Sequence, residues 1–390
     1  MGNVIGAGWG FYLNRLLVKK QLNSGLAKTD RKMVTRIKST IKKDTMKPAL
    51  PFRLLLLLIA LYWQSAVHAA SLNGRPLQTL AFGSCNHAHL PQPLWKLIES
   101  RNPDLFLWAG DVVYADTTDP AVMKRKYQQQ LDHPGYQQFL DRVPVIGTWD
   151  DHDYGGNNIG KHNPIKIQAQ DLFLDFIGES VDSPRRQRSG VYTSYTYGSG
   201  DNEVKVILLD TRFNKESLWV HGTDLLGREQ WRWLENEFRN STARVHLIVS
   251  SISVLSDPIP VVEDWIDHPV AHEKMFNLLD RHAVKGVAFL TGDRHFSAHL
   301  TRKVNGRRYH EFMSSGLTHY LRRKNASRFL RQYYRPQNTY FGRNFGLIDF
   351  DWDQSEPELR FRVYDTDNVE RLSRRFRLQG SQWRSVATDR

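Results

Sequence analysis

Short apolar runs that each end abruptly in polar residues are the feature that most limits how this chain can fold. The runs are too short for buried helices, and stretches with helical character separate them. Strands that alternate with helices along a chain predict an α/β fold. The expected strands that carry this argument are Leu77–Gly83, Asp104–Ala109, Pro144–Thr148, Val245–Ser250 and Val287–Leu290.

A predicted hairpin and several late strands indicate that the sheet is mixed. Val191–Tyr197 and Val204–Leu209 flank a Gly/Asp turn, which is the pattern of a hairpin. No clear linker follows the leader, so residues 70–390 are interpreted as one large domain. Most charged residues of Arg371–Arg390 are expected to form a solvated face. The expected late strands are Arg308–Ser314, Gly346–Asp351 and Leu359–Tyr364, and the expected helices are Pro93–Ser100, Ala121–Asp132, Tyr136–Arg142, Ile165–Ile177, Arg228–Phe238 and His272–His282.

The residues that follow the expected strands are of the types that bind metal ions. Taken singly, each cluster has an ordinary explanation as a turn, a solvated loop or, for Cys85, a small buried side chain. In open α/β sheets, however, ligands bind outside the carboxyl ends of the strands, so we expect the clusters to converge on one edge. Together they predict a metal site. The clusters are Gly83–His87, Gly110–Asp116, Trp149–Asn157 and Thr291–His295.

A basic and apolar leader precedes the predicted domain. Leu54–Trp63 is a ten-residue apolar run with basic residues before it and Val67-His68-Ala69 after it, which is the order of a secretory signal peptide. We interpret residues 46–69 as the signal peptide and residues 1–45 as an upstream extension outside the working protein. The expected location is therefore periplasmic, extracellular or in the secretory pathway. The alternative is an uncleaved membrane anchor, although the apolar run is short for a membrane span.

The net charge of +13 is concentrated in this leader. Residues 1–69 contain 12 Lys or Arg and 2 Asp or Glu, whereas the remaining 321 residues contain 42 and 39. The predicted domain is therefore nearly neutral, and its charge gives no support for a DNA or RNA partner. The chain has one cysteine, Cys85, so no internal disulfide can form. In an exported protein, such a thiol is expected to be either buried or bound to a ligand.

Several motifs share their order and spacing with those of one known family. They are Phe82–Asn86, Leu107–Asp116, Thr148–Asn157, Leu209–Arg212, Leu290–His295 and Ser314–Thr318. From about Thr79 to Thr318, and more weakly to Tyr364, the chain resembles the PhoD-like (alkaline phosphatase D) family of the metallophosphoesterase superfamily. The resemblance implies an α/β fold in which a β-sandwich of mixed sheets is flanked by helices, in the order α/β/β/α. It also implies hydrolysis of phosphomonoesters or phosphodiesters at a metal cluster, expected to contain iron with calcium.

The resemblance also implies roles for individual residues. Asp111 is expected to bridge two metals, and the Cys85 thiolate stands where the wider superfamily usually has an Asp-x-His pair, which suits iron. The calcium is expected to be held by harder oxygen ligands. Asp151 matches an asparagine of the superfamily, and Asn157 is a second candidate for the same duty. The implied metal ligands are Cys85, Asp111, Asp151, Asn157, Asp293 and His295, with Tyr114 and Asn86 as lesser contacts.

By the same resemblance, His152 is expected to be the catalytic histidine. A metal-activated water held near Asp111 would attack phosphorus, while His152 stabilises the transition state or protonates the leaving alkoxide. Arg212 or Arg294 is expected to clamp phosphate oxygens, the alternative being a structural ion pair. The chain departs from the superfamily at Leu247–Ile252, which ends in serines where a further histidine ligand is usual. This departure leaves the identity of the metals open.

The resemblance leaves the substrate class open. A phosphodiesterase that acts on lipid headgroups would be favoured by an aromatic surface containing Trp219, Trp265 and Tyr320, although each is a common type of core residue. The alternative from another class is a catalytically silent metal-binding protein on the same scaffold, against which the intact motifs argue. The expected partners are phosphoester small molecules or lipid headgroups. Nucleic acid is not expected, and a membrane contact is expected only through an uncleaved leader.

Overall fold

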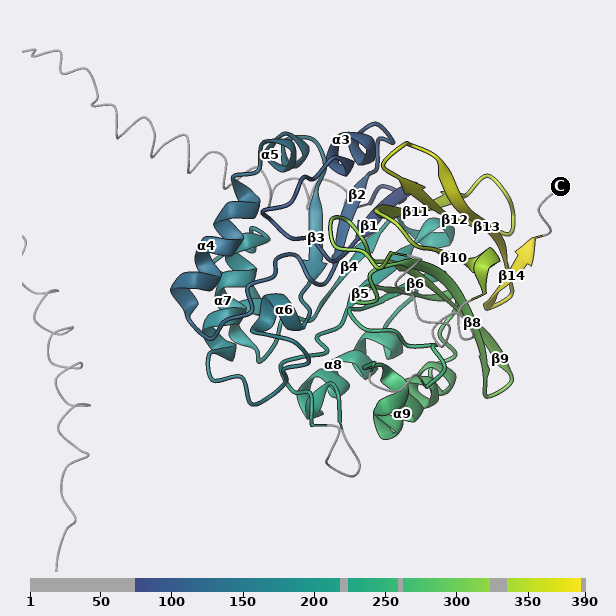
Figure 1. The fold of residues 1–390 in the computed structure, drawn as a ribbon. Coiled ribbons are helices and arrows are strands. Elements are labelled where there is room, and N and C mark those ends of the chain that lie inside the picture. The colour runs from purple at the N-terminus through teal and green to yellow at the C-terminus, as the bar shows by residue number, and fades with distance from the viewer. Residues whose placement is uncertain (1–73, 218–223, 259–261, 323–334, 387–390) are drawn as a thin grey trace, which may run out of the picture. The chain divides into compact units, whose positions relative to one another are not determined.

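Two mixed β-sheets of seven strands each form the centre of the fold in the computed structural model (Figure 1). The structure describes residues 74–217, 224–258, 262–322 and 335–386, so the predictions for residues 1–69 lie outside the described residues. Sheet 1 has the order β14-β13-β12-β11-β1-β2-β3, with β1, β2 and β3 parallel and the other pairs antiparallel. Its strands are β1 (Thr79–Gly83), β2 (Leu105–Ala109), β3 (Val145–Thr148), β11 (Asn344–Asp351), β12 (Glu358–Asp365), β13 (Glu370–Gln379) and β14 (Gln382–Val386).

Sheet 2 has the order β10-β8-β9-β7-β6-β5-β4. Its four central strands, β5, β6, β7 and β9, are parallel, and the flanking pairs are antiparallel. The predicted hairpin is formed by β4 and β5. The strands are β4 (Thr193–Tyr197), β5 (Val204–Leu208), β6 (Val245–Ser250), β7 (Val287–Thr291), β8 (Ser297–Val304), β9 (Arg307–Ser314) and β10 (Thr339–Tyr340).

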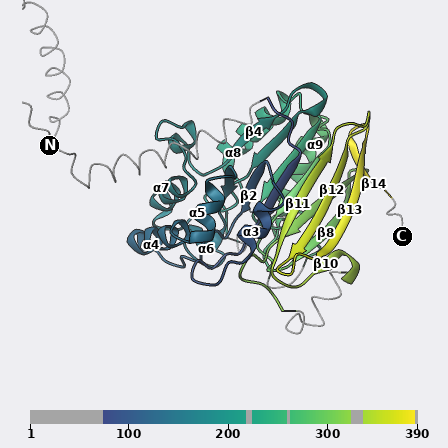
Figure 2. The ribbon, with the colours of Figure 1, turned by 90° about the horizontal axis from the view of Figure 1, so that it is seen from above.

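Apolar side chains on both faces of each sheet give the fold four layers. Between the sheets, Leu107 packs in one cluster with Leu247 and Phe312. Successive residues of a strand point to opposite faces, so the neighbouring Trp108 packs on the outer face of sheet 1 with residues of α3, α4, α5 and α7. On the outer face of sheet 2, Phe289 packs with α8 and α9. Figures 1 and 2 show these helices outside the two sheets, which confirms the predicted α/β/β/α sandwich of mixed sheets.

The described helices correspond closely to the expected ones, and the departures are short elements. Among the described residues, no helix is long and apolar enough to span a membrane. The α-helices are α3 (Leu94–Glu99), α4 (Pro120–Leu131), α5 (Pro134–Leu140), α6 (Asp151–Tyr154), α7 (Lys166–Phe176), α8 (Gly227–Arg239) and α9 (Pro269–Arg281). The 3₁₀ helices are η1 (Pro184–Gln187), η2 (Gly200–Asn202), η3 (Trp265–Asp267) and η4 (Pro336–Asn338).

The strands β8, β10, β13 and β14 were not expected from the sequence. In β13, exposed arginines alternate with Leu372, Phe376 and Leu378, whose side chains are buried in the core between the sheets. The prediction of a solvated face over Arg371–Arg390 therefore holds for one side of this strand, and the other side belongs to the core. Residues 387–390 lie outside the described residues.

Loops that leave the parallel strands of the two sheets meet at one edge of the sandwich. The Thr148 hydroxyl, at the end of β3, donates a hydrogen bond of 2.7 Å to the Leu209 carbonyl, which follows β5. The backbone NH of Gly292, after β7, donates to the Ser251 carbonyl, after β6, at 3.0 Å. These contacts bring the polar clusters of both sheets together, as the position of each cluster after a strand predicted.

We expect Gly292→Ala to destabilise this junction. A Cβ atom at residue 292 would lie 2.4 Å from the Ala109 carbonyl oxygen and 2.5 Å from the Ser84 hydroxyl oxygen, so the loops must move apart. The expected loss is about 1–3 kcal/mol in the free energy of unfolding, measured by urea denaturation. The control is Gly135→Ala in α5, where the new Cβ would meet a movable His133 ring at 3.3 Å. Equal stability of the two variants would contradict this account of the junction.

Candidate metal centre

Carboxylate, imidazole and thiol groups from both sheets lie together at this edge. Three overlapping groups have ligand atoms within 4.8 Å of one another, and Asp111, which follows β2, belongs to all three. A carboxylate that belongs to all three groups could contact more than one ion. The groups are Cys85, Asp111 and His295; Asp111, Asp151 and His152; and Asp111, Asp150, Asp151 and Asp293.

Burial and mutual repulsion leave these carboxylates without enough counter-charge. Asp111 and Asp150 are completely buried, and burial followed by the charge of Asp151 raises the pKa of Asp111 well above its usual value. Burial and neighbouring carboxylates raise the pKa of Asp150 to about 6 and that of Asp293 to about 7, although arginine side chains oppose the shifts. Oδ1 of Asp111 and Oδ2 of Asp150 have no hydrogen-bond partner among the described residues. Bound cations would satisfy both the charge and the unpaired oxygens, so these residues fit a metal site.

The group around Cys85 adds softer ligands to the carboxylates. The buried Sγ atom lies 3.4 Å from Oδ2 of Asp111 and 3.0 Å from the Ser315 hydroxyl oxygen. The Tyr114 hydroxyl lies 3.0 Å from Nε2 of His295 and donates to Oδ2 of Asp111 at 3.2 Å. Burial, followed by the nearby His319, lowers the pKa of His295 to about 3. His295 is therefore a neutral imidazole at neutral pH, which is the form that binds metals.

Four of these residues have left-handed backbone conformations. The φ angles are 60° at Cys85, 50° at Asp111, 69° at Asp293 and 61° at His295. Such conformations cost on the order of 1–3 kcal/mol each outside glycine and persist where the surroundings enforce them. Hydrogen bonds between the loops supply that constraint, since the NH of Asn86, next to Cys85, donates to the Asp111 carbonyl at 2.9 Å. The strain turns the side chains sharply away from their strands and into the centre.

His152 is oriented by a carboxylate that the sequence interpretation did not single out. Its Nδ1 lies 2.6 Å from Oδ1 of Asp116, and because a carboxylate only accepts, Nδ1 carries the proton and Nε2 is left for a ligand or substrate. Burial lowers the pKa of His152, but the hydrogen bond to Asp116 and the charge of Asp151 outweigh burial and raise it. A signal for Asp116 was its place at the end of the Gly110–Asp116 motif. Spacing could not show that it reaches His152.

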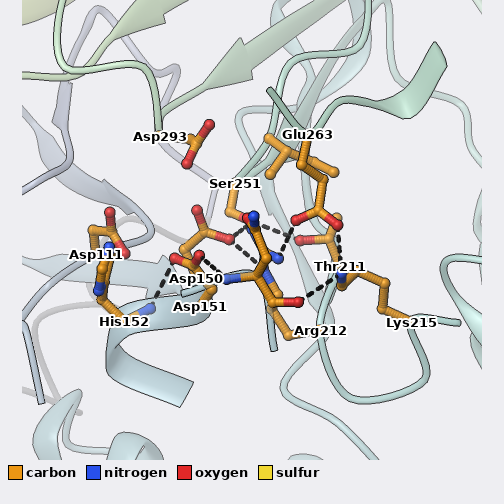
Figure 3. A network of polar contacts seen from close by, with 12 residues as sticks. Asp111, Asp150, Asp151, His152, Thr211, Arg212, Lys215, Ser251, Glu263 and Asp293 are labelled. Carbon is orange, nitrogen blue, oxygen red and sulfur yellow. Dashed lines mark hydrogen bonds and ion pairs between the residues drawn. The ribbon is translucent and has the colours of Figure 1, made fainter. Parts of the chain in front are cut away.

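Arg212 is held in ion pairs with two carboxylates. Figure 3 shows its guanidinium between Asp150 and Glu263, with Nε donating to Asp150 at 2.5 Å and Nη1 donating to Glu263 at 2.5 Å. Its side chain is fully buried. Lys215 forms a second ion pair with Glu263. These contacts correspond to the structural ion pair given above as the alternative to a phosphate clamp.

Other predicted residues are placed as follows. Asn157 is exposed, and no hydrogen bond connects it with the centre among the described residues. The Asn86 side chain donates to Gln130 at 2.6 Å and so supports the loop. Arg294 is paired with Asp264.

The structure also qualifies two predictions made from sequence. Trp265 is fully buried in the core under α8 and α9, so it does not belong to an aromatic surface, and Trp219 lies outside the described residues. Where the superfamily usually has a further histidine, the Ser251 hydroxyl instead donates to Oδ1 of Asp150 at 2.6 Å.

Comparisons with known proteins identify the family of the chain and support its fold. Residues 80–361 match the family model described as PhoD-like phosphatase. Alkaline phosphatase D of Bacillus subtilis (strain 168) is 23% identical over 274 residues, which cover 57% of this chain and 46% of that protein. The solved structure of PhoD superposes with a TM-score of 0.65 at 18% identity, covering 82% of this chain and 73% of that one. The match thus spans less than half of the curated relative, but the family model covers most of this chain. The chain belongs to the PhoD-like phosphatase family.

Proposed function

We propose that this protein hydrolyses phosphoesters of small molecules with the help of bound metal ions. The observation that carries the proposal is the convergence of four carboxylates, a thiol and a neutral imidazole on one sheet edge, with two buried carboxylate oxygens left unpaired. Membership of the PhoD-like phosphatase family supports the reaction class. Such a set of ligands is costly for a fold that holds no cation, because unpaired buried charge is strongly destabilising.

The donor atoms suggest two kinds of metal. Cys85, Asp111 and His295 offer sulfur, oxygen and nitrogen, a set that suits iron. Asp111, Asp150, Asp151 and Asp293 offer oxygen alone, a set that suits a hard cation such as calcium. Asp111 is common to both sets and would connect the two sites.

The chain's own residues would bind and orient the ester. Metal ions at this centre would neutralise phosphoryl oxygens and increase the acidity of a water molecule. His152, held by Asp116, is placed to stabilise the transition state or to give its Nε2 proton to the leaving alkoxide after protonation. Arg212 and Ser251 fix the Asp150 carboxylate from behind, so that its free oxygen keeps one position. Export through residues 46–69, action on lipid headgroups and the preference between monoesters and diesters stay predictions.

The direct test is hydrolysis of a chromogenic phosphomonoester and a chromogenic phosphodiester by wild type and Asp111→Asn. Because Asp111 belongs to every ligand group, we expect the variant to lose both bound metal and turnover, with kcat/KM reduced at least 100-fold. A chelator should abolish wild-type turnover, and the ratio of the two rates defines the substrate class. Asp201→Asn, whose side chain is 92% exposed, is the matched control and should keep both properties. Full activity of Asp111→Asn with metal still bound would disprove the scheme.

A second prediction concerns the stability of metal-stripped protein. The raised pKa values of Asp111 and Asp293, the latter about 7, mean that the folded state holds protons that the unfolded state has already released. The free energy of unfolding must then fall as the pH rises through the folded-state pKa values. Histidines act in the opposite sense over the interval from pH 6.5 to 8, because an imidazole in the unfolded chain has a pKa of about 6.5 and is still half protonated at the lower end. This effect is common to metal-stripped and metal-loaded protein, so a comparison of the two forms isolates the carboxylates.

We therefore expect the melting temperature of chelator-treated protein to drop relative to that of metal-loaded protein as the pH rises from 6.5 to 8. Calorimetry of both forms in matched buffers measures the difference. A difference between the two melting temperatures that stays constant or narrows over this interval would show that the carboxylates are not held together as described.

A further inference from the structure

Two histidines outside the ligand groups, His87 and His319, lie against the centre. The His87 ring stacks on Tyr114 with centroids 3.7 Å apart and planes at 21°, and His152 packs on Tyr114 at 4.2 Å and 32°. Two rings cannot share one face of a third at these distances, so Tyr114 lies between the two imidazoles. His319 completes the arrangement, with its centroid 4.3 Å from that of His295 and 4.9 Å from that of His87.

The two loops that carry these rings are fastened to each other and to the candidate ligand Cys85. The backbone NH groups of Thr318 and His319 both donate to the Cys85 carbonyl, at 3.2 and 3.1 Å. The backbone NH of His87 donates to the Thr318 hydroxyl at 2.6 Å. The Cys85 backbone thus fixes both imidazoles next to the centre, so any movement of one loop would disturb a candidate ligand.

Neither imidazole is satisfied in the way that a packed core histidine is. Within the described ranges, no hydrogen bond engages a ring nitrogen of His87 or His319, and both side chains are half-buried. By contrast, both ring nitrogens of the buried His246 have partners at 2.8 Å, the Lys285 carbonyl and the Ser241 hydroxyl. The imidazoles of His87 and His319 each carry at least one NH in either protonation state, so each ring can donate a hydrogen bond.

The geometry points to His87 and His319 as substrate-binding residues that donate hydrogen bonds to the oxygens of the phosphate group held at the centre. Neither residue belongs to a candidate ligand group, so a direct role in metal binding is not indicated among the described residues. The ring nitrogens of both histidines lack hydrogen-bond partners among the described residues, and the loops that carry the rings are fixed. Both rings lie beside the centre, next to Tyr114 and His295. They are therefore suited to donate hydrogen bonds to phosphate oxygens that the metals do not neutralise. This assignment rests on the proposed function and identifies further residues of the same site.

The test measures binding of inorganic phosphate to metal-loaded protein by calorimetry, together with kcat and KM for a chromogenic monoester. His87→Ala and His319→Ala should each weaken phosphate binding about tenfold or more and raise KM, with metal content unchanged. His319→Gln keeps an NH donor and should recover part of the affinity. His89→Ala is the control, because the His89 ring is exposed and, among the described aromatic contacts, touches only His87, with centroids 5.2 Å apart.

Each alternative outcome has a distinct meaning. Unchanged phosphate affinity with a raised KM would place the pair at the organic group of the ester and would overturn the assignment, as would no change in either quantity. Loss of metal in the alanine variants would make the rings part of the metal-binding shell, which also overturns it. If wild-type protein binds phosphate but hydrolyses no ester, the proposed function is refuted. The effect of the two alanine substitutions on phosphate affinity then still decides whether His87 and His319 bind phosphate. Absence of phosphate binding by metal-loaded wild type would refute the pair's role.

Discussion

Repulsion among buried carboxylates is the constraint on which the rest of the centre depends. Among the residues labelled in Figure 3, five carboxylates face two side-chain cations, Arg212 and Lys215, and both of these cations are also paired with Glu263. Arg212 neutralises Asp150 in part, yet the pKa of Asp150 is still raised, to about 6, by burial and by Asp151. A fold maintains such an arrangement at neutral pH when multivalent cations complete it. Under the proposed function, the ion pair of Asp150 with Arg212 would hold one carboxylate oxygen in place for such a cation.

The sandwich makes this concentration of charge possible because parallel strands in both sheets release their loops at one edge. Four of the side chains reach the centre through sharp turns, which the left-handed conformations at Cys85, Asp111, Asp293 and His295 provide. Gly292 allows the loop after β7 to approach the backbone after β2 more closely than any side chain would permit. The two packed sheets thus enforce the left-handed backbone conformations and the close contact between the loops. These two features together define the positions of the candidate ligands.

Much of this arrangement could be predicted from sequence because the information was local. Each apolar run predicts a strand, and the residues soon after the runs include Cys85, Asp111, Asp151 and Asp293. Because ligands bind outside the carboxyl ends of strands in such sheets, these residues are expected to lie close together. Contacts between distant segments could not be predicted in this way. The sequence around Arg212 does not reveal its ion pair with Glu263. The spacing of adjacent carboxylates does not show that Asp150 belongs to a candidate ligand group. Nor does it show that Asp116 forms a hydrogen bond with His152. The strand β13 was missed because its exposed arginines obscure a period-two apolar pattern.

The central claim is that sulfur-containing and all-oxygen ligand sets bind different metals and share Asp111. Elemental analysis of purified wild type and Cys85→Ser tests it most directly. The account predicts near-stoichiometric transition metal and calcium in wild type, and selective loss of the transition metal in Cys85→Ser, because serine removes the thiolate while leaving the carboxylates intact. Absence of bound metal from wild type, even after iron and calcium are supplied, would contradict the account. Retention of the full transition-metal content by Cys85→Ser would contradict the assignment of the thiol.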